Sequence, residues 1–240
     1  MYLLVALLTL AAASDLQPVL PRLAAQFEQQ TGHRVKVTFG SSGNFLAQIQ
    51  NGAPFDVFLS ADIDYPKQLE SARLTEPGTM YSYATGFLVL WARHGSGVDL
   101  TRGLEALTSA RVRRVAIANP AHAPYGRAAV SALRRAGLYE RVRAKFVFGE
   151  NVSQAAQFAQ SGNADAGIIP LALARAPALV AAGGYVDISP ALYPAIEQAA
   201  VVLRSSRDKS AARAFIDFLK RPDTMRTLAA AGFGAPPPAH

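Results

Sequence analysis

The chain has 240 residues, of which half are hydrophobic and 17% charged, and it contains no cysteine. This composition predicts a globular protein of one large domain or two lobes, and it excludes disulfides, thiolate metal sites and cysteine nucleophiles. The formal net charge of +7 invites comparison with nucleic-acid-binding proteins. The cations are mostly Arg scattered along the chain, however, and no recognition-helix, zinc-finger or aromatic–basic strand motif organises them. We therefore interpret them as solvated helix faces and expect no nucleic-acid partner.

The apolar run at residues 2–13 has two interpretations. It ends in Ala11-Ala12-Ala13-Ser14, which resembles the hydrophobic region and cleavage site of a signal peptide. No positive charge precedes it, and a dozen residues are too few to span a bilayer. We favour a buried first strand of a parallel sheet, because the helix expected to begin near Asp15 should follow a strand and no other early segment supplies one. An export signal is then expected upstream of this start or is missing from this chain.

Strand-like and helix-like segments alternate along most of the chain. Strands are expected at residues 2–13, 35–39, 57–59, 87–91, 115–118, 146–148, 166–169, 185–188 and 199–203. Helices are expected from near Asp15 to Thr31, between Gly43 and Asn51, and at 64–71, 127–135, 153–160, 208–220 and 222–230. This alternation predicts an α/β architecture with largely parallel sheets.

Four loops share one pattern, in which each follows a predicted strand and opens a predicted helix. They are Ala13-Ser14-Asp15, Gly40-Ser41-Ser42-Gly43, Ala123-Pro124-Tyr125-Gly126 and Glu150-Asn151-Val152-Ser153. In open α/β sheets, ligands bind beyond the carboxyl ends of strands, where such loops gather. The first N–H groups of a helix lack intrahelical partners and its dipole is positive there, so a helix start suits an anion. If two lobes face each other, two helix starts from each would meet around one small anion.

The same segments carry a resemblance to a known family. They are Ala11–Ser14, Phe39–Ser42, Asn51–Pro54 with Asp56–Asp62, His122–Gly126, Glu150–Val152, and Ala214–Leu219 with Gly232-Phe233. In this order, across essentially the whole chain, they resemble the periplasmic molybdate-binding proteins of ABC transporters. The resemblance implies a two-lobed type II periplasmic-binding-protein fold, in which each lobe is a mainly parallel sheet flanked by helices. We expect residues 1–84 and 199–240 to form lobe 1 and residues 85–198 to form lobe 2, joined by two crossover segments.

The resemblance also implies which residues contact the oxyanion. Ser14 and Ser42 are each expected to donate from the hydroxyl and the backbone N–H, and Tyr125 and Val152 from the backbone N–H. The backbone N–H of Asp15 is a further candidate. No catalytic residue, cofactor or direct cation ligand is implied, because molybdenum would be bound only as the oxyanion through these same residues.

One position departs from the family pattern. Some members use a tyrosine hydroxyl where this chain has Pro170, which has neither a hydroxyl nor an N–H. Our hypothesis is that Tyr125, in the neighbouring site loop, supplies that ring instead.

A site made of uncharged hydrogen-bond donors is chemically suited to a dianion. A tetrahedral oxyanion taken from water needs hydrogen bonds to all its oxygens, because unpaired buried charge is costly. Donors without acceptors also select a fully deprotonated ligand, since hydrogen phosphate would bring a proton that finds no acceptor. Molybdate, tungstate and sulfate all meet this requirement, so cavity size must separate them.

Each candidate residue also has a plainer interpretation. Ser14 and Ser42 are each suited to capping a helix, the commonest role of serine at that position. His122 is expected to be a loop histidine without a metal, because the four histidines show no paired ligand spacing. Asp56 and Asp62 flank one short strand and point apart, so both are interpreted as turn or cap residues rather than a carboxylate pair.

The combined expectation is an extracytoplasmic solute-binding protein that captures molybdate, and tungstate, and delivers it to a membrane-embedded ABC permease. We expect a periplasmic monomer without enzymatic activity. Three alternatives stay open: a binding protein for another oxyanion such as sulfate, an enzyme built on the same lobes, and a ligand-sensing domain of a regulator. The enzyme is disfavoured by the absence of cysteine and of an activated Ser–His pair, and the regulator would need an attached helix-turn-helix.

Overall fold

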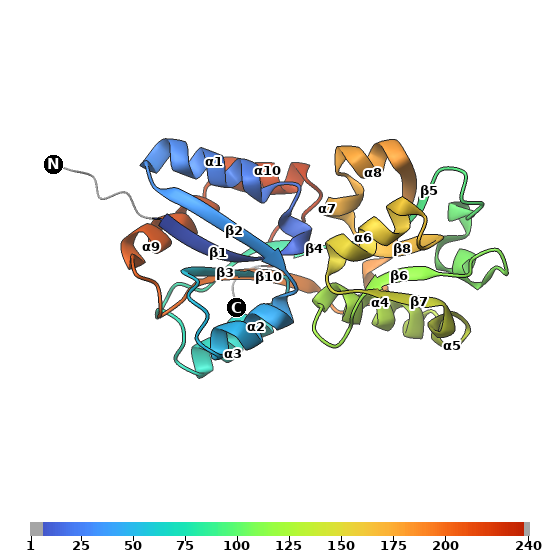
Figure 1. Ribbon diagram of the computed structural model, residues 1–240, viewed down its shortest axis with the longest axis horizontal. Helices are drawn as coiled ribbons and strands as arrows, with labels where there is room; N and C mark the ends of the chain where they lie inside the picture. Colours follow the sequence, from blue (N-terminus) through green and yellow to red (C-terminus); the bar gives the residue numbers. More distant parts are fainter. Residues whose placement is uncertain (1–6, 238–240) are drawn as a thin grey trace. The chain divides into compact units, whose positions relative to one another are not determined.

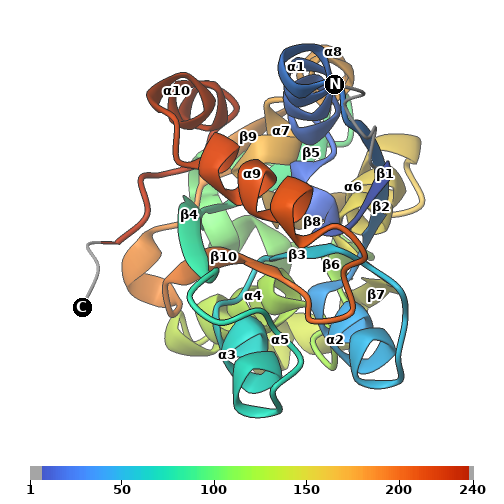
Figure 2. The same cartoon turned by 90° about the vertical axis from the view of Figure 1, so that its left-hand side faces the viewer.

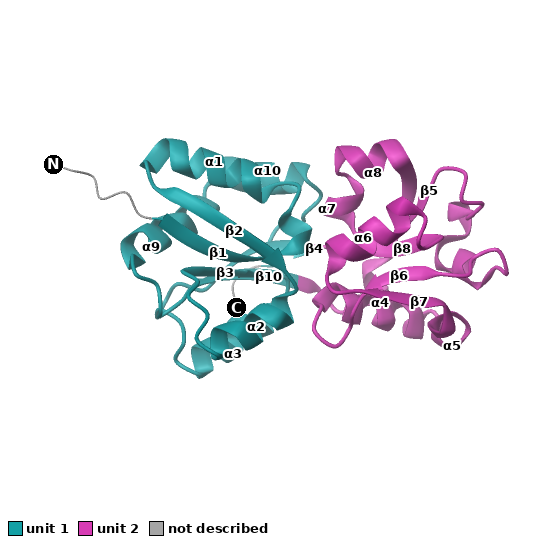
Figure 3. Ribbon diagram, in the orientation of Figure 1, with its two compact units in different colours: residues 1–85, 197–240 teal, residues 86–196 magenta. Residues whose placement is uncertain are grey.

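The computed structural model describes residues 7–237, and the part of the predicted first strand at residues 2–6 lies outside this range (Figure 1). The chain divides into two compact α/β units, one made of Met1–Thr85 with Glu197–His240 and the other of Gly86–Ile196 (Figure 3). The chain therefore leaves unit 1 after Thr85 and returns to it at Glu197.

The sheet of unit 1 has five strands in the order β2-β1-β3-β10-β4. Its strands are β1 Leu7–Ala13, β2 Arg34–Gly40, β3 Val57–Ser60, β4 Tyr81–Gly86 and β10 Ile196–Val202. β1 pairs in parallel with both β2 and β3, whereas β10 runs antiparallel to β3. β1, β2 and β3 thus run parallel, as predicted, and the antiparallel β10 makes the sheet mixed. An antiparallel neighbour needs no crossover helix, which a parallel one does.

Helices cover both faces of this sheet: α1 Leu20–Thr31, α2 Ser42–Gln50, α3 Asp64–Ser71, α9 Lys209–Leu219 and α10 Pro222–Ala230. Figures 1 and 2 show α1 and α10 on one side and α2 and α3 on the other. Ala11, Phe58 and Val201 are register partners on adjacent strands, so they share one face, where Phe45 of α2 and Leu69 of α3 pack against them.

The helix predicted to begin near Asp15 begins later. A single 3₁₀ turn, η1 Ser14–Leu16, follows β1, and α1 starts only at Leu20. Pro21 explains the delay, because a proline is tolerated in the first turn of a helix but would remove a hydrogen bond from the interior of one begun at Asp15. The helix ends at Gly32, as predicted, with a φ of 76° that glycine adopts without steric cost.

The sheet of unit 2 has the order β7-β6-β8-β5-β9. Its strands are β5 Leu88–Arg93, β6 Val115–Ala118, β7 Phe146–Gly149, β8 Ala166–Pro170 and β9 Gly183–Asp187. β6 pairs in parallel with β7 and β8, and β5 runs antiparallel to both β8 and β9. This sheet is also mixed, although four of its five strands run in one direction.

The α-helices of unit 2 are α4 Pro124–Arg135, α5 Tyr139–Val142, α6 Val152–Ser161, α7 Leu171–Ala174 and α8 Pro177–Ala182. Three 3₁₀ segments complete it: η2 Leu100–Thr108, η3 Arg143–Lys145 and η4 Pro190–Leu192. In Figure 1, α6, α7 and α8 lie on one side of the sheet and α4 and α5 on the other. The predicted helices at 127–135 and 153–160 are therefore present as α4 and α6, with α4 starting one turn earlier.

Asp56 is a long-range anchor, which corrects its interpretation as a local turn or cap residue. Its side chain is only 7% exposed. Oδ2 accepts hydrogen bonds from the backbone N–H and the hydroxyl of Thr9, both at 2.7 Å. Oδ1 accepts from Ser206 Oγ at 2.8 Å and from the N–H of Arg207 at 3.3 Å. Asp62 does behave as predicted, because its Oδ1 accepts from the N–H of Asp64 at the start of α3.

We predict that Asp56→Ala lowers the free energy of unfolding by about 3 kcal/mol, because it leaves several buried donors without an acceptor. Urea unfolding of the purified protein measures this change. Asp217→Ala is the matched control, since Asp217 is exposed and pairs only with Lys220 one turn away, and it should change stability by less than about 0.5 kcal/mol. Equal effects of the two substitutions would contradict the anchoring role.

Candidate functional site

The strand ends of unit 1 bring two of the predicted ligand residues to one edge of its sheet. Ala13 at the end of β1 is the register partner of Gly40 on β2, and Ala12 is the partner of Leu59 on β3. Ser14 comes directly after β1, and Ser42 comes two residues after β2. Both serines are buried, with 2% and 1% exposed. Their proximity follows from parallel pairing, which places the carboxyl ends of neighbouring strands side by side.

Ser42 is the first residue of α2, but its hydroxyl does not cap the helix. The N-cap is Ser41, whose side chain makes no capping hydrogen bond. Ser42 Oγ instead accepts from the backbone N–H of Ala61 at 3.0 Å. This bond occupies an acceptor site of the hydroxyl and orients it, so its proton is directed to another acceptor. Ala61 follows β3, and sequence reasoning missed it because its role needs only a backbone N–H.

Ser14 does not cap an α-helix either. It opens η1, a turn of only three residues, and the N-cap of α1 is Val19. A turn this short carries little dipole of its own. What Ser14 offers at the strand end is a buried hydroxyl and a backbone N–H.

The Asp15 side chain is directed into unit 1. It is fully buried, and its Oδ2 accepts a hydrogen bond from Nε2 of Gln198 on β10. Gln198 Oε1 in turn accepts from the Tyr83 hydroxyl at 2.7 Å. Because the carboxylate is engaged in this network, only the backbone N–H of Asp15 remains as a candidate ligand contact. Neither Gln198 nor Tyr83 carries a local sequence signal for this role.

In unit 2, the starts of α4 and α6 follow neighbouring strand ends. Ala118 at the end of β6 is the register partner of Gly149 at the end of β7. The two following loops are joined by a hydrogen bond from the Asn119 N–H to the Gly149 carbonyl at 2.8 Å. A second contact also joins them, with 3.6 Å between His122 Nε2 and Glu150 Oε1. His122 thus links two loops.

Tyr125 and Val152 occupy the first turns of these helices. Tyr125 follows Pro124 at the start of α4 and is 3% exposed, and Val152 is the first residue of α6 and is 6% exposed. The first intrahelical hydrogen bonds are donated later, by Arg127 to Ala123 and by Ala155 to Asn151. The backbone N–H groups of Tyr125 and Val152 therefore belong to the set that a helix start directs outward.

Two side-chain hydrogen bonds, similar to those of a capping box, fix the first turn of α6. Asn151 Oδ1 accepts from the Gln154 N–H at 3.1 Å, and Gln154 Oε1 accepts from the Glu150 N–H at 2.6 Å. These two hydrogen bonds hold the backbone around Val152 in a defined conformation. The Asn-x-x-Gln spacing is a readable capping signal that sequence reasoning did not use.

Two glycines let these helices approach the strands closely. A Cβ placed on Gly126 would lie 2.2 Å from the Ala118 carbonyl oxygen, and one on Gly149 would lie 2.5 Å from the Ala155 nitrogen. Neither contact can be relieved by a flexible side chain, because the opposing atoms are backbone. The positions of the α4 and α6 starts therefore depend on the absence of a side chain at both residues.

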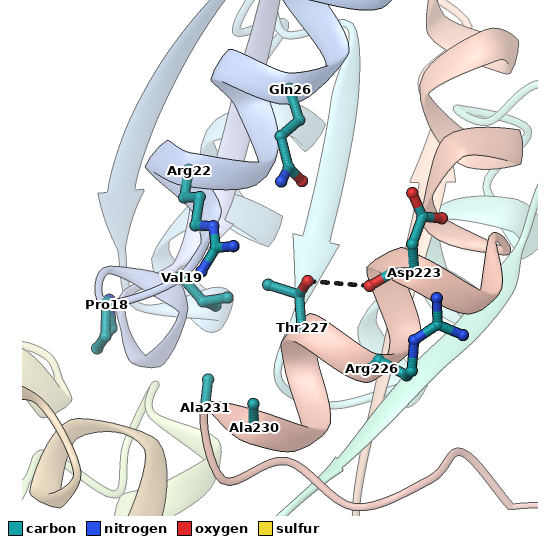
Figure 4. A pocket seen from close by; sticks show the side chains of 9 residues that line it. All are labelled: Pro18, Val19, Arg22, Gln26, Asp223, Arg226, Thr227, Ala230 and Ala231. Atoms are coloured by element: carbon teal, nitrogen blue, oxygen red, sulfur yellow. Dashed lines mark hydrogen bonds between the residues drawn. The ribbon is translucent and has the colours of Figure 1, made fainter.

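A separate groove of 550 Å³ lies in unit 1 between α1 and α10 (Figure 4). Its lining residues are Pro18, Val19, Arg22, Gln26, Asp223, Arg226, Thr227, Ala230 and Ala231. Most of them are exposed or half-exposed, and none is a predicted ligand residue. This groove is distinct from the strand-end loops that carry Ser14 and Ser42.

Residues 7–237 contain no group of three or more His, Cys, Asp or Glu side chains arranged to hold a metal ion. Within the same range, none of the helices combines the length and apolar character needed to cross a membrane.

Comparison with known proteins identifies the family. Residues 8–234 match the family described as bacterial extracellular solute-binding protein. The chain belongs to this family. Its members bind solutes for transport, which is a non-enzymatic role, and the fold is that of the type II periplasmic binding proteins.

Similar proteins span nearly the whole chain. The molybdate-binding protein ModA of Azotobacter vinelandii is 39% identical over 93% of this chain and 88% of its own length. ModA of Rhodobacter capsulatus is 38% identical over 93% and 86%. The solved structure of the Azotobacter vinelandii periplasmic molybdate-binding protein superimposes with a TM-score of 0.87 at 37% identity, covering 95% of this chain and 99% of that one.

We predict that Gly126→Ala lowers the free energy of unfolding by about 2–3 kcal/mol, because the added methyl group must displace the backbone of either α4 or β6. Gly184→Ala in the same unit is the control, since a Cβ there meets only Leu100 Cδ1 at an ordinary 3.6 Å. The control should change stability by less than about 0.5 kcal/mol in urea unfolding. A Gly126→Ala protein as stable as the control would show that the α4 start tolerates displacement.

Proposed function

We propose that this protein binds molybdate, with tungstate as a second ligand, and delivers it in the periplasm to a membrane-embedded ABC permease. Two ModA relatives at 39% and 38% identity, each covering 93% of this chain, support the ligand class. The observation that carries the proposal is the Ser42 hydroxyl, which is buried at a helix start and oriented by the Ala61 N–H. We propose that the protein acts as a monomer.

The proposed contacts come from both units. Ser14 and Ser42 in unit 1 donate from the hydroxyl and the backbone N–H, and Tyr125 and Val152 in unit 2 donate from the backbone N–H. Asp15 contributes at most its own N–H, because its carboxylate is engaged elsewhere. None of these groups is a cation, so the starts of α2, α4 and α6 supply the potential that offsets the charge of the dianion.

This donor set favours a fully deprotonated oxyanion. The Ser42 hydroxyl already accepts a hydrogen bond from the Ala61 N–H and directs its own proton to the ligand, and backbone N–H groups can only donate. Hydrogen phosphate therefore leaves its own proton unsatisfied, at a cost of about 1–3 kcal/mol for a buried polar group. Sulfate has the same donor requirement as molybdate and differs in size, so it is the competing ligand to test.

We predict that molybdate and tungstate raise the melting temperature and that phosphate does not. At a hundredfold excess over its dissociation constant, a ligand stabilises the folded state by about 2.7 kcal/mol. For a chain of this size that corresponds to roughly 5–10 °C, measurable by thermal unfolding with each oxyanion in turn. If only sulfate raises the melting temperature, sulfate and not molybdate is the ligand. If no oxyanion raises it, the protein is not an oxyanion-binding protein.

Ser42→Ala is expected to weaken molybdate binding about ten- to hundredfold, because one ligand oxygen loses a buried hydrogen bond. Isothermal titration calorimetry measures the dissociation constant. Ser71→Ala is the control, since Ser71 is exposed and its hydroxyl bonds only to the Lys67 carbonyl within α3. Unchanged binding by Ser42→Ala would remove this hydroxyl from the site.

Tyr125→Phe tests the hypothesis that the Tyr125 ring replaces the family tyrosine missing at Pro170. The structure places Pro170 at the end of β8, buried and paired with Leu88, where it offers no donor. A hydroxyl contact predicts about tenfold weaker molybdate binding by the phenylalanine variant. Unchanged affinity would limit Tyr125 to its backbone N–H.

A further inference from the structure

A chain of three buried side chains crosses unit 1 beside the Ser14 turn. The Tyr83 hydroxyl on β4 donates to Gln198 Oε1 on β10 at 2.7 Å, and Gln198 Nε2 donates to Asp15 Oδ2 in η1. Tyr83 is 2% exposed, and the other two are fully buried. Because all three side chains are buried, the loss of either hydrogen bond in this network is expected to lower the stability of the protein.

The direction of every hydrogen bond in this network is fixed. Burial, with a smaller contribution from the Asp15 charge, raises the pKa of Tyr83 well above its usual value of 10. The phenol therefore keeps its proton and donates at neutral pH. The Asp15 carboxylate accepts, so Gln198 presents its NH₂ group to Asp15 and its carbonyl to Tyr83, whose hydroxyl donates to it.

The turn that carries Ser14 is too short to be held rigidly by helical hydrogen bonds of its own. Ser42 opens a nine-residue helix, whereas Ser14 opens a three-residue turn closed by a hydrogen bond of 3.3 Å from the Gln17 N–H to the Ser14 carbonyl. Asp15 is the next residue after Ser14, so a bond that fixes its carboxylate also fixes the backbone that carries the Ser14 hydroxyl. The network thus supplies the rigidity that a longer helix supplies to Ser42.

The same network reaches both strands through which the chain passes between units. Tyr83 lies two residues before Thr85, where unit 1 is left, and Gln198 lies one residue after Glu197, where it is re-entered. The Ser14 turn is therefore tied to both crossover strands by side-chain bonds as well as by the sheet.

We infer that Asp15, Gln198 and Tyr83 are positioning residues for the oxyanion, holding the Ser14 hydroxyl and N–H in the geometry that binds it. The inference rests on the proposed function. In this inference the three side chains do not contact the ligand themselves. They increase its affinity by preorganising Ser14, which does contact it.

The test compares two variants that each lose one buried hydroxyl from unit 1. Tyr83→Phe keeps the ring and removes the hydroxyl, which donates to Gln198 Oε1 at 2.7 Å and lies 3.4 Å from the Ser60 carbonyl. Ser206→Ala removes the donor to Asp56 Oδ1 at 2.8 Å, which lies at the opposite end of β3 from the Ser14 and Ser42 loops. Both should lower the melting temperature by about 2–4 °C, as expected for the loss of one buried hydrogen bond.

Molybdate binding separates the two variants. Tyr83→Phe is expected to bind molybdate about tenfold more weakly in calorimetry, with most of the change in the dissociation rate measured by stopped-flow. Ser206→Ala is expected to bind molybdate with the affinity of the unaltered protein. If Tyr83→Phe binds within twofold of Ser206→Ala, the positioning role is overturned. If the unaltered protein does not bind molybdate, the proposed function fails instead, so the two failures are distinguishable.

Two substitutions of Asp15 test whether the hydrogen bond to Gln198 is the feature that matters. Asp15→Asn and Asp15→Ala both remove the carboxylate charge, but the asparagine keeps an oxygen acceptor for Gln198 Nε2 and should therefore bind molybdate more tightly than the alanine variant. Asp15→Ala loses the acceptor and should bind about tenfold more weakly. Equal binding by the alanine and asparagine variants would overturn the inference.

Discussion

The parallel strand pairs that end at a common edge are the constraint on which the rest of this structure depends. In unit 1 the register aligns Ala13 with Gly40, and in unit 2 it aligns Ala118 with Gly149. Parallel strands must deliver their following loops to the same side of the sheet. Four loops with hydroxyl or backbone donors are thereby gathered in pairs.

Unit 1 holds its sheet with a buried polar network at each end. At one end Asp56 joins Thr9 to Ser206, and at the other Asp15 is joined through Gln198 to Tyr83. Both networks connect β1 or its following turn to the segments around β10, which is distant in sequence. Buried polar networks favour one arrangement of strands, because another arrangement would leave these polar groups without their partners.

The basic character of the chain does not extend to the candidate ligand residues. Ser14, Ser42, Tyr125 and Val152 are all buried and none is cationic, although the net charge is +7. Neutral donors offer hydrogen bonds whose directions are fixed by the fold, and helix starts supply a partial positive charge. Under the proposed function, such donors would discriminate among anions by protonation state and size.

Local patterns in the sequence determined the strands and most helices, because periodicity, proline and glycine act within a few residues. The strand Val115–Ala118 and the helix Pro222–Ala230 were predicted with the bounds observed. Strand β4, the antiparallel placement of β10 and the late start of α1 were missed or wrong. Only the tertiary structure decided the partners of Asp15, Asp56 and Ser42. Those partners lie 183, 150 and 19 residues away at Gln198, Ser206 and Ala61, a separation over which the chemistry of a side chain leaves no local signal.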